Sequence, residues 1–206
     1  MEHLKVYDID KNYIGIASRT EIHKKGLWHE TFHCWFACQE GEKTYIYFQL
    51  RSRKKADFPY LLDVTSAGHI LADETIQDGI REVEEELGIS LTIDDIEKLA
   101  EIPYCVIKDK GEFIDREFAN VYLYRQPIQF LDFTLQKEEV AGIFRAEWTE
   151  FVQLFTSLKE KIEMDGFEIL DKGIVQWKKE KIGMDAFVPH PEKYYHCIIK
   201  EIGERL

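Results

Sequence analysis

The chain has 206 residues, 45% of them hydrophobic and 32% charged, which suits a globular protein with a substantial core rather than a disordered segment. Its formal net charge of −12 disfavours general binding to nucleic acid, because the phosphate backbone repels an acidic protein. The N-terminus lacks a signal pattern and no apolar run approaches the roughly 20 residues of a membrane helix, so we expect a cytoplasmic protein without membrane contacts.

The chain begins with β-like runs separated by turns. A hairpin is predicted within residues 1–27, where Asp-Lys-Asn at 10–12 supplies the turn. The aromatic-rich runs 29–39 and 44–51 form a predicted antiparallel pair. Further strands are expected later in the chain, at 98–107, 114–125 and 139–148.

The clearest helical pattern lies between these strands, at residues 75–88. Thr75 stands where a cap is expected, and Gly88 ends the helix in the position that glycine favours. Apolar residues recur at spacings of four, three and four, which places them in one narrow stripe. They are Ile76, Ile80, Val83 and Leu87.

The rest of the chain mixes helices with strands. A second helical pattern covers 149–162, and a third runs from Glu192 to Arg205. We expect one domain over residues 1–162, with a C-terminal helical extension over 163–206 packed on it, in an α/β (α+β) fold. The aromatic residues of this extension either cap a pocket or form a homodimer interface, and the sequence does not choose between them.

Three glutamates crowd the side of the 75–88 helix opposite its apolar stripe: Glu82, Glu85 and Glu86. Like charges at this spacing destabilise a bare helix. A hard divalent cation with oxygen ligands would relieve the repulsion. A solvated acidic face is the simpler explanation for such a run taken alone, so the wider pattern must decide.

The wider pattern runs from Gly68 through Glu74 to residues 81–89 (REVEEELGI), and it resembles the Nudix box. In that family, glycine, five residues, glutamate and seven residues precede Arg-Glu-apolar-any-Glu-Glu-any-Gly-apolar. The second half matches at every specified position, while six residues instead of seven separate Glu74 from Arg81. The resemblance implies a Nudix α/β/α sandwich with a mixed β-sheet, in which the box forms a loop–helix–loop beside the substrate cleft.

The resemblance also implies roles by position. Glu82, Glu85 and Glu86 would bind Mg²⁺ or Mn²⁺, and Glu85 is the one assigned to the attacking water. Arg81 would orient a glutamate by ion pairing, and Glu74 would support the site. A purely structural ion pair is an equally open role for Arg81.

A second resemblance is to isopentenyl-diphosphate isomerase and its Nudix hydrolase relatives. It is carried by His23, residues 28–31 (WHET), Trp35, Phe36 and residues 66–69 (SAGH). In the isomerase, histidines at the positions of His23, His29 and His69 hold a metal, and a catalytic cysteine precedes Gly-His. Here Ala67 takes that place and cannot transfer protons, so isomerisation is disfavoured. Gly68 and His69 are also predicted substrate contacts, and a second metal site at the three histidines stays open beside ordinary packing.

Two positions outside the box complete the candidate site. Glu139 stands where relatives carry a metal-binding or basic glutamate, although a solvated loop acid is equally open. Arg51 is expected to grip a phosphate, because a guanidinium binds phosphate in a bidentate way. For Lys54 and Lys55, a solvated basic loop is at least as good an explanation.

Together these patterns predict a metal-dependent Nudix hydrolase that cleaves a diphosphate bond in a nucleoside diphosphate derivative or a nucleotide. The expected partner is this small diphosphate molecule. The alternatives are an isoprenoid-diphosphate isomerase and a catalytically silent Nudix module that binds a nucleotide or a protein. Ala67 counts against the first and the intact glutamates count against the second. The substrate itself is not named, because specificity lies in loops and in the tail.

Overall fold

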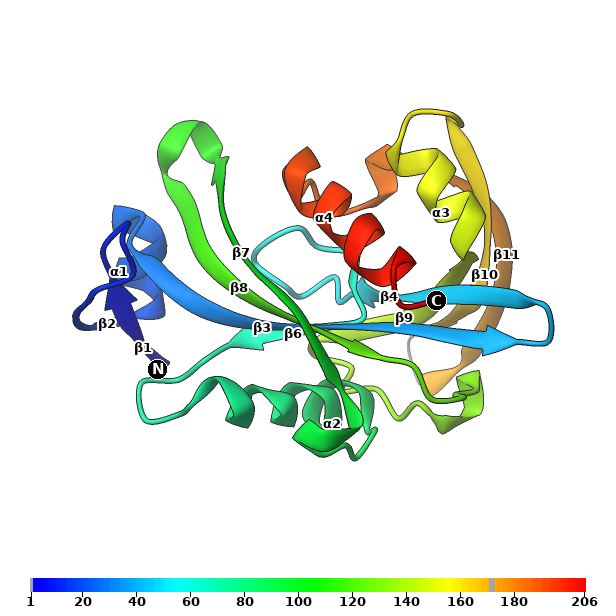
Figure 1. Cartoon of the computed structure of the whole chain (residues 1–206), viewed down its shortest axis with the longest axis horizontal. Helices are drawn as coiled ribbons and strands as arrows, with labels where there is room; N and C mark the ends of the chain where they lie inside the picture. Colours follow the sequence, from blue (N-terminus) through cyan, green and yellow to red (C-terminus); the bar gives the residue numbers. More distant parts are fainter. Residues whose placement is uncertain (1, 171–172) are drawn as a thin grey trace.

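The computed structural model of the chain describes residues 2–170 and 173–206, apart from the side chain of residue 109. Over these residues, eleven strands form one sheet (Figure 1). Its main path runs β11-β10-β9-β4-β3-β1-β2, while β6 and β8 also pair with β3. The strands are β1 (His3–Tyr7), β2 (Tyr13–Ser18), β3 (Trp28–Glu40), β4 (Lys43–Arg51), β5 (Leu62–Val64), β6 (Ser66–His69), β7 (Glu97–Lys108), β8 (Phe113–Tyr124), β9 (Val140–Glu147), β10 (Lys161–Ile169) and β11 (Val175–Gly183).

The helices cover both faces of the sheet, with α2 on one face and α3 and α4 on the other (Figure 1). β3 is buried on both faces: Phe32, Cys34 and Phe36 point to one face, while Trp35 and Ala37 point to the other. Phe32 and Phe36 share one core cluster with α2, while Trp35 shares the other with α3 and α4. The helices are α1 (Arg19–Lys25), α2 (Arg81–Leu87), α3 (Trp148–Phe155) and α4 (Glu192–Gly203). In the described part of the chain, no helix is long and apolar enough to cross a membrane.

The predicted strands are confirmed. β1 and β2 form the N-terminal hairpin, in which the Asp8 carboxylate accepts hydrogen bonds from the backbone of Asp10 and Asn12. β3 and β4 form the antiparallel pair, and β7, β8 and β9 lie where three later strands were expected. The sheet is mixed because β3 and β8 run parallel, with His29 opposite Glu117.

The predicted helix at 75–88 is divided in two. Residues 76–80 form a tight 3-10 turn, and only Arg81–Leu87 is α-helical. A Cβ on Gly79 would lie 2.6 Å from Cβ of Phe32, so the turn is pressed against β3 at a residue without a side chain. The apolar spacing of a regular helix did not reveal this close approach.

The predictions for 149–162 and for a helical tail are wrong in part. α3 ends at Phe155, and Ser157 adopts a left-handed conformation with φ of 59°, which stops the helix. Residues 161–169 and 175–183 are instead strands, which pair with each other and extend the sheet beyond β9. Alternating burial along β10 explains the outcome, since Ile162 and Met164 are buried while Glu163 between them is exposed. Of the tail, α4 alone matches the helix that was expected there.

Candidate active site

A cavity of about 560 Å³ lies beside α2 and gathers most of the predicted site residues. Its wall is built from β3, β6, β7, β8, α2, the loop after β4 and the C-terminal segment around Val188 and His190. Carboxylates outnumber arginines and lysines in this wall. Such a cavity favours cations, and an anionic substrate needs cations to enter it.

The carboxylates of α2 differ in burial. Glu86 is 3% exposed and accepts hydrogen bonds from Nε2 of Gln49 and Oγ of Ser66, both at 3.3 Å. Burial, with a smaller contribution from the Glu82 charge, raises the pKa of Glu86 to about 8. Burial also raises the pKa of Glu82. The side chain of Glu85 is 56% exposed at the cavity rim.

Gly68 is required by the close approach of β6 to α2. A Cβ at Gly68 would lie 2.1 Å from the carboxyl carbon of Glu82, so any side chain there would displace this carboxylate. Ser66, two residues earlier on the same face of β6, donates to Glu86. His69 lies on the opposite face of the strand, with the histidines described below.

Arg81 joins the two halves of the box pattern. Its guanidinium donates to Glu74 (Nη2–Oε2, 3.0 Å), to Glu82 (2.6 Å), to Glu85 (3.2 Å) and to the carbonyl of His69 (3.1 Å). The missing residue between Glu74 and Arg81 therefore does not prevent their contact. Arg81 thus forms ion pairs with Glu74, Glu82 and Glu85.

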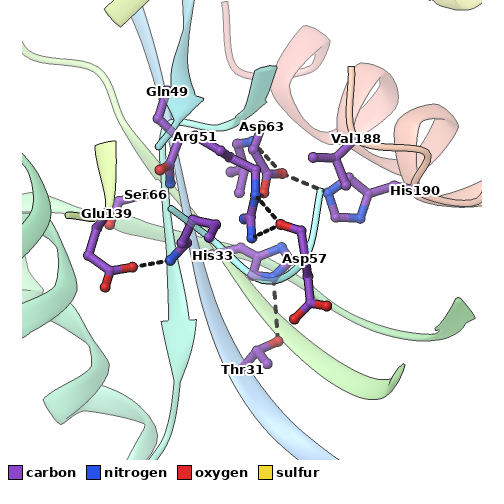
Figure 2. A network of polar contacts seen from close by, with 12 residues as sticks. Thr31, His33, Gln49, Arg51, Asp57, Asp63, Ser66, Glu139, Val188 and His190 are labelled. Carbon is purple, nitrogen blue, oxygen red and sulfur yellow. Dashed lines mark hydrogen bonds and ion pairs between the residues drawn. The ribbon is translucent and has the colours of Figure 1, made fainter. Parts of the chain in front are cut away.

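Arg51 lies in the cavity wall but most of its donors are engaged. It donates to Asp63 at 2.8 Å and twice to the carbonyl of Asp57, at 2.9 and 3.2 Å (Figure 2). Asp63 in turn accepts a hydrogen bond from Nε2 of His190 at 2.8 Å. Although burial opposes it, His190 and Arg51 hold the pKa of Asp63 well below its usual range. Arg51 thus ties the loop after β4 and the C-terminal segment to the sheet.

Glu139 also lines the cavity, apart from this network in Figure 2, and forms an ion pair with Lys55. Lys55 is therefore not part of a solvated loop, since its side chain is only 18% exposed. Lys54 fits the solvated description, being 71% exposed and 3.5 Å from Glu138.

The three predicted histidines do come together. One ring nitrogen from each of His23, His29 and His69 lies within 4.8 Å of the others, and Asp115 and Glu117 offer oxygens to His29 in the same way. The Nε2 atoms of all three histidines and Oδ1 of Asp115 are buried without a hydrogen-bond partner. Burial lowers the pKa of His29 to about 4 and that of His69 well below its usual range. Neutral imidazoles with unpaired nitrogens are the form that binds a metal ion, so these residues fit one.

Several cavity residues were not predicted from the sequence. Asp115 and Glu117 face the histidines because β8 runs parallel beside β3, and their spacing of two in a predicted strand was the signal. His190 had no such signal. It reaches the cavity because β10 and β11 carry the chain back to β5, where Leu62 forms a bridge with Phe187.

No family model matches the chain. Two curated relatives are 37% identical to it. One is an uncharacterized Nudix hydrolase of Clostridium acetobutylicum, over 98% of this chain and 97% of that protein. The other is Nudix hydrolase 3 of Arabidopsis thaliana, over 73% of this chain and 20% of that protein. An isopentenyl-diphosphate Delta-isomerase of Serratia proteamaculans is 27% identical over 59% of this chain and 65% of its own length.

Solved structures agree in fold. A protein of Deinococcus radiodurans superposes with a TM-score of 0.57 at 19% identity, covering 76% of this chain and 88% of that one. A MutT/nudix family protein from Enterococcus faecalis gives a TM-score of 0.52 at 14% identity, covering 85% of this chain and 61% of that one. The large mixed sheet with helices on both faces is thus the Nudix fold.

Proposed function

The chain belongs to the Nudix hydrolase family, a family of pyrophosphohydrolases, and from this premise we propose that it cleaves a diphosphate bond in a nucleoside diphosphate derivative or a nucleotide, with Mg²⁺ or Mn²⁺. The observation that carries the proposal is the buried carboxylate of Glu86 next to the partly buried carboxylate of Glu82, with Glu139 at the same cavity. Carboxylates in such a place are costly to ionise unless a cation joins them.

Each residue of the site has a distinct task in this proposal. When bound, a divalent cation neutralises the diphosphate and makes water more acidic. Glu82 and Glu86 hold it together with Glu85, and Gln49 and Ser66 fix the orientation of the Glu86 carboxylate. The exposed rim position of Glu85 suits a group that also takes the proton of the attacking water, and Glu139 is the second group within the cavity for that task.

A second metal centre at His23, His29 and His69 is part of the proposal. Asp115 and Glu117 complete the donor set, which gives nitrogen and oxygen ligands in a buried place. Nε2 of His23 and of His29 lie 3.4 and 3.6 Å from Oδ1 of Asp115 but make no hydrogen bond. This supports the proposal, because buried polar atoms without hydrogen bonds are costly unless something binds them.

The experiment that tests the proposed function is a substrate panel. Wild-type protein with Mg²⁺ is incubated with nucleoside diphosphate derivatives, nucleoside triphosphates, dinucleoside polyphosphates and isoprenoid diphosphates, and the products are identified by chromatography. Cleavage of at least one diphosphate bond is expected. Binding of a nucleotide without turnover would favour the silent module instead.

Isomerisation of isopentenyl diphosphate is expected to be absent. Ala67 lines the cavity where the isomerases place a cysteine, and its methyl group neither donates nor accepts a proton. The hydroxyl of neighbouring Ser66 is already used by Glu86. Incubation in deuterated water, followed by NMR of the allylic position, should show no exchange under conditions in which a panel member is cleaved. Deuterium in dimethylallyl diphosphate would reverse the assignment.

A further inference from the structure

The side chain of Lys55 occupies a place among carboxylates that the box pattern does not explain. Its Nζ pairs with Oε2 of Glu139 and lies 4.0 Å from Oε1 of Glu86. In the described residues, no other lysine or arginine forms an ion pair with Glu86. Lys55 thus lies between Glu86 on α2 and Glu139, two glutamates that are more than fifty residues apart in the chain.

The backbone around Lys55 is held in place. The carbonyl of Asp57 accepts two hydrogen bonds from Arg51, and the backbone N–H of Ser52 donates to the carbonyl of Glu139 at 2.8 Å. The ammonium of Lys108 lies 4.2 Å from the ring centre of Phe58. We therefore expect the side chain of Lys55, with its four methylene groups, to move more readily than the backbone of the loop.

Lys55 lies beside Glu86, which the proposed site assigns to a metal ion, and it pairs with Glu139, which is expected to bind metal or to act as a base. An ammonium group about 4 Å from Glu86 cannot keep this place beside a divalent cation on the same carboxylate without strong repulsion. We infer that Lys55 is an internal counter-ion that competes with the divalent cation for Glu86 and Glu139, and that it turns to a phosphate of the substrate when the cation is bound.

The cavity supplies the destination for the displaced ammonium. Lys55 and Glu139 both line it, so the side chain reaches the diphosphate by rotating about its own bonds. Arg51, another cation that lines the cavity, already donates to Asp63 and Asp57. Lys55 therefore becomes the available phosphate contact on this side. This second half of the inference rests on the proposed activity, whereas the competition for Glu86 and Glu139 rests only on the proposed metal site.

The test compares Lys55→Met and Lys55→Arg with a matched control, Lys54→Met, on the neighbouring exposed lysine. Binding of Mn²⁺ alone, without substrate, is measured by isothermal titration and by electron paramagnetic resonance. Lys55→Met should bind Mn²⁺ roughly 10- to 30-fold more tightly, because one like charge is removed from beside the ligands. Lys55→Arg and Lys54→Met should stay near the wild-type affinity.

The proposed contact between Lys55 and a phosphate is tested separately, by turnover of a substrate found in the panel. For Lys55→Met, kcat/KM should fall roughly tenfold or more at saturating Mn²⁺, mainly through KM. Unchanged or weaker Mn²⁺ binding in a folded Lys55→Met protein would overturn the counter-ion role. Tighter Mn²⁺ binding with an unchanged kcat/KM would overturn the phosphate contact. A wild-type protein that cleaves nothing would refute the proposed function and the phosphate contact with it, while the Mn²⁺ titration would still decide the competition.

Discussion

Replacing Glu86 by glutamine is expected to lower kcat by roughly 10²- to 10³-fold, the range found when one electrostatic group of an active site is removed. The glutamine oxygen still accepts from Gln49 and Ser66, so the fold should persist while the negative charge is lost. Glu85→Gln is expected to cost at least 10²-fold. Steady-state kinetics at saturating Mg²⁺ measure both effects.

Glu84→Gln is the matched control for these variants. Glu84 lies on the same helix, is exposed, and occupies the position that the box leaves unspecified. Its replacement should leave kcat within about twofold of the wild type, as expected for a surface substitution without partners. Near-normal rates for Glu86→Gln and Glu85→Gln would mean that α2 is a structural helix here.

The substitution Glu86→Gln should also change how the stability of the protein depends on pH. Glu86 has a pKa of about 8 in the folded protein, against an ordinary value near 4.5. The unfolded chain therefore loses this proton first, and this group makes the folded state less stable as pH rises from about 4.5 to about 8. In buffer with a chelator, the Tm of Glu86→Gln should therefore fall less than the Tm of the wild type as pH rises through this range. Parallel curves of Tm against pH for the two proteins would contradict the assignment.

Removal of divalent cations is expected to abolish turnover of any panel substrate, by more than about 10³-fold, and added Mg²⁺ or Mn²⁺ should restore it. The physical reason is that carboxylates outnumber the arginines and lysines of the cavity wall, so a diphosphate is repelled when no divalent cation is present. The measurement is initial rate before and after dialysis against a chelator. Full turnover in excess chelator would remove the proposed mechanism.

Metal content separates the two proposed centres. Protein reloaded with Mn²⁺ should bind two ions if both centres form, and His29→Leu should bind one fewer. His29 is fully buried, so leucine is the replacement that keeps the volume nearly constant. His196→Leu, on an exposed histidine of α4, is the control and should leave the content unchanged. If His29→Leu and the wild type bind the same number of Mn²⁺ ions, the histidines do not hold a metal and only the glutamates do.

The part of the site that local patterns define was predictable. Glu82, Glu85 and Glu86 lie within five residues, so helix geometry alone places them on one side. The resemblance implied an ion pair between Arg81 and a glutamate, and the structure pairs Arg81 with Glu74, seven residues away, although the family pattern is one residue longer.

The remainder depends on pairing between distant strands, which a single sequence does not encode locally. Asp115 and Glu117 meet His29 only because β3 and β8 run parallel in this register. Lys55 reaches Glu86 only because β4 lies beside β9 and brings the loop after β4 to Glu139. The strands β10 and β11 fall mostly in the tail that was expected to be helical, and the alternation that starts at residue 162 was the signal for a strand.

The four residues of β6 serve both proposed centres, with Ser66 and Gly68 toward α2 and His69 toward the histidines. An insertion or deletion of one residue within this strand would turn each side chain to the wrong face and dismantle both centres at once. The turn after Glu74 is packed against Phe32 at Gly79, but it carries no side chain of either centre, and it already accommodates a box one residue shorter than the family pattern. Changes in chain length are therefore expected to cost less activity between Glu74 and Arg81 than within Ser66–His69.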